Sequence, residues 1–176
     1  MTPTDDDGRV RGDAAEMRRA FDRLFAAPDP PAAGETEDFV AVRVGGRPFA
    51  LRVVELARVE VRRKVTTLPG AAPGLLGLVS VRGQIVPAFS LELALGLPAT
   101  PAAKPWLAVA AGEPPFGLAF DALDGYLRVP RADVLGGDGP GAPAVVRAAG
   151  ELRPVVSMAA VLAAVRGWGS SPAGGH

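Results

Sequence analysis

Residues 74–98 read GLLGLVSVRGQIVPAFSLELALGLP and contain the clearest structural pattern of the chain. Two short runs typical of β-strands, 75–81 and 84–89, flank the turn pair Arg82-Gly83. Pro87 lies inside the second run and indicates an edge strand or a bulge, because proline cannot donate a hydrogen bond to a central ladder. The apolar stretch SLELALGL then predicts a short helix.

The same pattern recurs at one ungapped offset of 67 residues. The matched pairs are Phe39 and Trp106, Ala41 and Ala108, Gly45 and Gly112, Pro48 and Pro115, Phe49 and Phe116, Leu51 and Leu118, Gly83 and Gly150, Pro87 and Pro154, Ser90 and Ser157, and Leu95 and Leu162. A shared offset over this length indicates two copies of one strand-rich unit, each ending in a short apolar helix.

Strand-like runs also precede the first stretch. FVAVRV (39–44) and PFALRVV (48–54) flank Gly45-Gly46 and predict a hairpin, and LARVEV (56–61) alternates apolar and charged residues as a half-buried strand does. About five short strands per unit favour closure into a small barrel, which hides the sheet edges. We therefore predict a mainly β protein with two tandem five-stranded β-barrel subdomains, at about 39–98 and 106–165.

Residues 1–37 differ from the rest and predict an N-terminal extension. Asp13 and Glu16 form a capping pattern at the start of a helix that ends before Pro28. The apolar face of this amphipathic helix is formed by Met17, Phe21, Leu24 and Phe25. Three interpretations remain open: docking on the chain's own domain, binding to a partner, or disorder. Residues 167–176 are expected to be a flexible tail.

The composition excludes several kinds of chemistry. The chain has no cysteine and one histidine, His176, in the predicted tail, so neither a disulfide nor a zinc site nor any other cofactor is expected. No apolar stretch is long enough to span a membrane, and the acidic start is not a secretory signal, which predicts a cytoplasmic protein. Formal net charge is zero, with 19 basic and 19 acidic residues.

Two alternative functions follow from the charged residues. An enzyme that uses carboxylates would rely on Asp121, Asp124 or Glu113, although a D-x-x-D spacing more often makes turns. A nucleic-acid-binding barrel would use the basic cluster between Arg58 and Lys64. That alternative predicts interleaved aromatic residues, which are only 6% of this chain.

The stretch 74–98 resembles the signature of CheW-like domains: a glycine, a few β residues, an Arg-Gly turn, then I-V-P and a helix. The similarity extends over roughly 38–166, and the family fold of two SH3-like β-barrels agrees with the duplication. The resemblance implies a non-catalytic adaptor that couples chemoreceptors to a CheA-type histidine kinase. The implied partners are the kinase regulatory domain and the cytoplasmic tip of a methyl-accepting chemoreceptor. It also implies recruitment to receptor arrays and possible weak self-association.

The resemblance assigns partner-binding positions to one strand and to the Arg-Gly segment. They are Leu56, Arg58, Gly77, Val79, Val81, Arg82 and Gly83. Gly83 would permit a tight turn, Arg82 would be exposed for charge-assisted bonds, and Val81 with Leu56 would supply apolar contact. The alternative is a purely structural turn glycine and a solvated or internally paired arginine.

Three positions depart from the family pattern. Ser80 replaces a common asparagine, Ser90 replaces a usual aspartate, and Arg58 replaces a frequent acidic residue. Because charge reversal penalises an established partner, a second hypothesis is a divergent interaction module for a dedicated pathway such as motility or development.

Overall fold

The computed structural model describes residues 34–62, 64–137 and 143–169. The predicted N-terminal helix with Met17, Phe21, Leu24 and Phe25, the basic residue Arg63, and the tail with His176 lie outside these residues. The described helices and strands belong to the compact unit that begins at Thr36.

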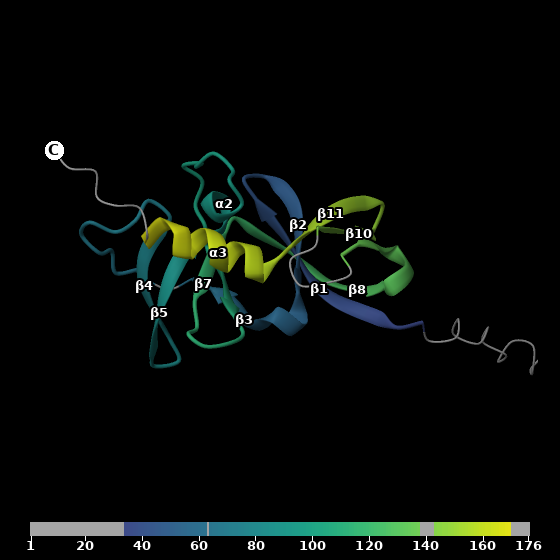
Figure 1. Cartoon of the computed structure of the whole chain (residues 1–176), viewed down its shortest axis with the longest axis horizontal. Coiled ribbons are helices and arrows are strands. Elements are labelled where there is room, and N and C mark those ends of the chain that lie inside the picture. Colours follow the sequence, from purple (N-terminus) through teal and green to yellow (C-terminus); the bar gives the residue numbers. More distant parts are fainter. Residues whose placement is uncertain (1–33, 63, 138–142, 170–176) are drawn as a thin grey trace, which may run out of the picture. The chain divides into compact units, whose positions relative to one another are not determined.

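The strands and helices follow one another in two similar series (Figure 1). The first series is β1 (Thr36–Val44), β2 (Arg47–Arg52), the 3-10 turn η1 (Val53–Glu55), β3 (Leu56–Val61), β4 (Leu75–Val81), β5 (Gln84–Ser90) and α2 (Leu91–Ala94). The second is β6 (Trp106–Ala110), β7 (Gly117–Phe120), β8 (Ala122–Pro130), η2 (Arg131–Asp133), β9 (Val134–Gly136), β10 (Ala144–Ala148), β11 (Glu151–Val156) and α3 (Met158–Gly169).

The predicted hairpins are present. β1 pairs antiparallel with β2 across Gly45-Gly46, and β4 pairs antiparallel with β5 across Arg82-Gly83. One predicted strand is shorter than expected, because 48–54 ends at Arg52 and η1 follows.

The strands form two sheets, which confirms the predicted mainly β fold. Sheet A has six strands in the order β8-β1-β2-β11-β10-β9, and sheet B has five in the order β3-β6-β7-β5-β4. In Figure 1 the labelled strands of sheet B lie on the left and those of sheet A on the right.

Each sheet contains strands from both copies of the repeat, which corrects the expectation of one barrel per repeat. The chain crosses from sheet A to sheet B at η1, and crosses back at Asp121 between β7 and β8. Sheet A is therefore built from 36–52 and 122–156, and sheet B from 56–90 and 106–120. The first strand of each copy pairs with the third strand of the other, as β1 with β8 and β6 with β3.

The offset of 67 residues holds in the register of the β4–β5 and β10–β11 hairpins. Val81 pairs with Gln84 in the first copy, and Ala148 pairs with Glu151 in the second. The parallel contacts between copies obey it too, because Ala50 pairs with Val155 in sheet A as Gly117 pairs with Ala88 in sheet B.

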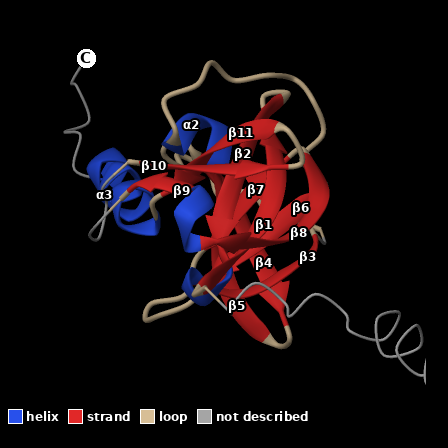
Figure 2. Cartoon of the chain, turned by 90° about the vertical axis from the view of Figure 1, so that its right-hand side faces the viewer, coloured by secondary structure: helices blue, strands red, loops and turns tan. Residues whose placement is uncertain are grey.

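The largest core cluster joins both sheets to both helices. It includes Val42 and Leu51 from sheet A, Phe120 from sheet B, and Leu91 and Val161 from the helices. Figure 2 shows α2 and α3 on the same side of the strands. Burial of this apolar surface is the main stabilising contribution to such a fold.

The helix α3 crosses from β11 towards β4 and β5 (Figure 1). Its Trp168 lies 6.0 Å from Phe89, measured between ring centroids. A Cβ atom at Gly74 would lie 2.0 Å from the Trp168 ring, so a larger residue there would displace this ring. No helix of the described residues is both long and apolar enough to cross a membrane.

Candidate functional site

The β4–β5 hairpin turns at Arg82 and Gly83, since Val81 pairs with Gln84. Both turn residues have positive φ, 47° for Arg82 and 82° for Gly83, as a type I′ turn requires. This backbone conformation is unfavourable for arginine, whereas glycine adopts it freely. Both residues are exposed, so the turn holds the Arg82 side chain at the tip of the hairpin.

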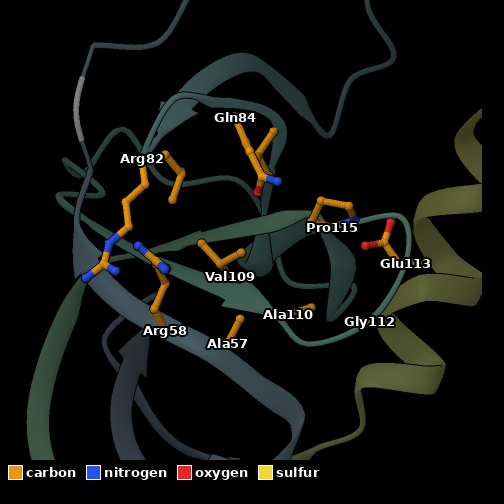
Figure 3. A pocket seen from close by; sticks show the side chains of 11 residues that line it. Ala57, Arg58, Arg82, Gln84, Val109, Ala110, Gly112, Glu113 and Pro115 are labelled. Atoms are coloured by element: carbon orange, nitrogen blue, oxygen red, sulfur yellow. The ribbon is translucent and has the colours of Figure 1, made fainter.

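A pocket of about 190 Å³ lies beside this tip. Its walls come from β3, from the β4–β5 hairpin, from the end of β6 and from the connection between β6 and β7 (Figure 3). The lining residues are Ala57, Arg58, Val81, Arg82, Gln84, Val86, Val109, Ala110, Gly112, Glu113 and Pro115. The volume is below the roughly 300–1,000 Å³ typical of small-molecule sites.

Two arginines from different strands share this pocket. Figure 3 shows the side chains of Arg58 and Arg82 converging at one side of it, while Glu113 lies at the opposite end. Arg58 contacts Glu60 of its own strand at 3.9 Å, which is a long and weak ion pair. Within the described part of the chain Arg82 has no acidic partner. The arginine side of the pocket is therefore positive.

A second hollow adjoins the pocket across Arg82. It measures about 460 Å³ and is lined by Glu60, Lys64, Ser80, Arg82 and Gly83. Neither hollow is lined by an aromatic side chain, so neither offers the stacking surface of a single-stranded nucleic-acid site.

A bulge in β3 shapes the pocket floor. The β3–β6 register shifts between Leu56 and Arg58, which leaves Ala57 as the extra residue. Bulges of this kind redirect side chains beside functional surfaces. The backbone N–H of Ala111 donates to the carbonyl of Glu55 at 2.9 Å and holds the β6–β7 connection against the start of β3. Burial raises the pKa of the Glu55 carboxyl.

The structure brings Arg58, Val81 and Arg82 together in the pocket, with Gly83 in the adjoining hollow. The other assigned positions have mainly internal contacts. Val79 is 1% exposed and lies in the core of sheet B, and Leu56 packs partly buried against the central cluster.

Two of the assigned positions, Val81 and Gly77, are buried. Val81 is only 5% exposed and lines the pocket, so the apolar contact expected of it is limited to the pocket wall. Gly77 is buried with φ of 139°, and a Cβ atom there would lie 2.2 Å from the carbonyl oxygen of Thr66. Close packing alone thus accounts for glycine at this position.

Sequence reasoning missed one wall of the pocket and an exposed apolar side chain. The wall consists of Val109, Gly112, Glu113 and Pro115, which belong to the other copy of the repeat. The side chain is Ile85, 64% exposed beside the hairpin tip. Ile85 could have been found from strand alternation, since it pairs with the exposed Ser80.

The equivalent hairpin end in sheet A holds a cluster of charges. Arg153 is 7% exposed, and its guanidinium donates to Asp124 at 2.8 Å and also to Glu151. Arg43 completes the cluster, with its Nε 3.1 Å from Asp124 and its Nη2 3.7 Å from Glu151. All four charges of this cluster have partners.

The carboxylates of the enzyme alternative do not converge on one another. Asp124 belongs to the charge cluster, Asp121 accepts a hydrogen bond from the Gly46 backbone N–H at 3.2 Å, and Glu113 lines the pocket in the other sheet. Asp121 and Asp124 thus have structural partners. Among the described residues no group of three or more histidine or acidic side chains is placed to hold a metal ion.

The family model described as CheW-like domain matches residues 38–166, well over half of the chain. The chemotaxis protein CheW of Bacillus subtilis (strain 168) is 31% identical over 62 residues, which are 35% of this chain and 40% of that protein. A probable chemotaxis protein CheW of Rhizobium etli is 28% identical over 94 residues, 52% of this chain and 61% of that protein. Each alignment thus spans less than two thirds of the relative.

A solved structure has the same fold. The scaffolding protein TtCheW from Thermoanaerobacter tengcongensis superposes with a TM-score of 0.60, over 70% of this chain and 90% of that one. The two sequences are 13% identical, so this likeness bears on the fold alone.

Proposed function

The chain belongs to the CheW-like domain family of non-catalytic chemotaxis adaptors and scaffolds, and we propose that it couples chemoreceptors to a CheA-type histidine kinase. In this role it binds the regulatory domain of the kinase and the cytoplasmic tip of a methyl-accepting receptor. It acts in the cytoplasm, where receptor arrays recruit it.

The observation that carries the proposal is the exposed hairpin tip at Arg82-Gly83 beside a small, partly apolar pocket. Arg82 occupies an unfavourable backbone conformation and has no acidic partner within the described part of the chain, so folding alone does not account for it. A pocket of about 190 Å³ suits one or two side chains of a protein partner better than a free metabolite.

Calorimetric titration with the regulatory domain of each CheA-type kinase encoded by the same organism tests the proposal. We expect saturable binding to one kinase, with an affinity of micromolar order, about −8 kcal/mol. Arg82→Ala should weaken this binding at least tenfold.

Arg147→Ala is the matched control. Arg147 is an exposed arginine on β10, at the position equivalent to Ser80 in the other copy. Its replacement should leave the affinity unchanged. A folded protein that binds none of the kinase domains and none of the receptor tips would contradict the coupling role.

A second candidate is an interaction module for a dedicated pathway, such as motility or development. The observation that favours it is the pair of arginines in one pocket, because Arg58 adds positive charge where the family commonly has an acidic residue. Binding to one specialised kinase, without binding to the others, would support this version.

A further inference from the structure

We propose that the pocket beside Arg82 receives a carboxylate side chain of a protein partner, held between Arg58 and Arg82. The inference deepens the proposed function, since it names the chemistry of the partner at the same site.

The pocket and the charge cluster occupy equivalent places in the two sheets. The offset of 67 residues sets Ala57 on Asp124, Gln84 on Glu151 and Val86 on Arg153. The bulges agree with this correspondence. In sheet A the β1–β8 register shifts so that Asp124 is the extra residue, as Ala57 is in sheet B. Each bulge thus leaves the equivalent residue unpaired, while the register against the neighbouring strand differs by one residue, since Leu123 pairs with Val42 and Leu56 with Ala110.

The two places differ in what fills them. In sheet A the Arg153 guanidinium fills the space and is bonded to Asp124, to Glu151 and to the carbonyl of Val42. In sheet B the equivalent residue is Val86, whose shorter side chain leaves the pocket open. The same place is thus filled by the Arg153 ion cluster in sheet A and is an open pocket in sheet B.

The charges at the rim also differ. Arg58 and Arg82 stand where the other copy has Gly125 and Ala149. Two guanidinium groups that share one pocket repel each other, and an anion placed between them removes the repulsion and accepts bonds from both. The contact between Arg58 and Glu60, at 3.9 Å, leaves most of this positive charge uncompensated.

The remaining walls favour an aspartate or glutamate of a protein over a phosphate group or a nucleic acid. Val81, Val109 and Pro115 line the pocket with apolar atoms that suit the methylene groups of a side chain, while the acidic Glu113 lies at the end away from the two arginines. Ile85 extends this apolar surface outside the pocket, at 64% exposure.

A peptide titration tests the carboxylate independently of any kinase. The probes are N-acetyl-Leu-Glu-Leu-amide and its Gln counterpart, added to the full chain while the arginine Nε–Hε NMR signals are followed. The signals are assigned with Arg58→Lys, Arg82→Lys and Arg147→Lys. We expect the Glu peptide to shift the signals of Arg58 and Arg82 at millimolar concentration, without an equal shift from the Gln peptide or at Arg147.

Equal shifts with both peptides, or none at Arg58 and Arg82, would overturn the inference. A larger shift with inorganic phosphate than with the Glu peptide would overturn the assignment to a carboxylate. If the kinase titrations fail and the Glu-specific shifts are present, the coupling role fails and the carboxylate site stands. If a kinase binds while Arg58→Ala and Arg82→Ala bind it as tightly as the wild type, the coupling role stands and the site does not.

Discussion

The hairpin ends at 81–84 in sheet B and 148–151 in sheet A share a register and a turn conformation, and differ in their charges. Both turns combine a positive-φ residue with a glycine, Arg82-Gly83 in one and Ala149-Gly150 in the other. In sheet A four charged side chains satisfy one another, whereas in sheet B two arginines face an open pocket. The two ends thus share a backbone conformation, while the charged side chains that fill the end in sheet A have no counterpart in sheet B.

The helices that end the two copies show a second difference. The four-residue α2 is anchored by a buried ion pair, because Glu92 is 1% exposed and its carboxylate lies 2.9 Å from the Lys104 ammonium. The twelve-residue α3 is anchored by the Trp168 ring against Phe89. Both helices also contribute to the central apolar cluster, through Leu91 of α2 and Val161 of α3.

The largest effect is expected when the buried arginine of sheet A is copied into sheet B. Val86→Arg places a guanidinium in the pocket of Arg58 and Arg82, without counterparts of the Asp124 and Glu151 that pair with Arg153, and should lower the free energy of unfolding by about 3–5 kcal/mol. Adding Ala57→Asp and Gln84→Glu supplies the counterparts of Asp124 and Glu151 and should recover more than half of the loss. Urea denaturation measures both variants, with Val86→Met as the size control. If Val86→Arg alone is as stable as the wild type, the pocket in sheet B is not equivalent to the place that Arg153 fills in sheet A.

Removing Lys104, the ion-pair partner of Glu92 in α2, should have the next largest effect on stability. Lys104→Met leaves Glu92 buried without its cation and should lower the free energy of unfolding by about 3 kcal/mol at pH 7.

The loss of unfolding free energy in Lys104→Met should depend on pH. Burial opposes ionisation of Glu92, but the Thr100 N–H and the Lys104 ammonium hold its pKa below the ordinary value. Its stabilising contribution is therefore present at neutral pH and lost as the pH falls through this lowered pKa. In Lys104→Met the carboxyl protonates more readily, so the deficit should shrink between pH 7 and pH 4. A deficit that stays constant would contradict the ion-pair anchor.

The anchor of α3 predicts a smaller effect. Gly74→Ala introduces a methyl group against the Trp168 ring and should lower the free energy of unfolding by about 1–3 kcal/mol. Gly167→Ala is the matched control, because a Cβ atom there meets nothing within 4 Å. This control should raise the stability by about 1 kcal/mol through helix propensity. Thermal unfolding of both variants distinguishes packing against Trp168 from a general intolerance of alanine.

The smallest effect on stability is expected from asparagine substitutions at the two turns, and only one of them should also affect binding. Asparagine tolerates a positive φ better than arginine or alanine, so Arg82→Asn and Ala149→Asn should each raise the stability by roughly 0.5 kcal/mol. Only Arg82→Asn should weaken binding to the kinase regulatory domain. Equal binding by both variants would mean that the two turns are functionally alike.

Much of the fold could be predicted from sequence, because strand alternation, turn pairs and the offset are local features. The exchange of strands between the two copies could not be predicted. The sequence shows the same offset whether a sheet contains strands of one copy or of both. For the same reason the sequence missed Val109 and Pro115, which line the pocket from the second copy. Strand alternation could have predicted that Val79 and Val81 are buried, because their side chains point to the face opposite the exposed Ser80.

The most direct test of the central claim is the affinity of the filled-pocket variant, A57D/Q84E/V86R, for the regulatory domain that the wild type binds. Circular dichroism and urea denaturation first establish that the variant is folded, and Arg147→Ala serves as the reference for an exposed arginine away from the pocket. If the open pocket is the partner site, filling it should lower the affinity at least tenfold while Arg147→Ala binds normally. A folded, filled-pocket protein that binds as tightly as the wild type would contradict the account.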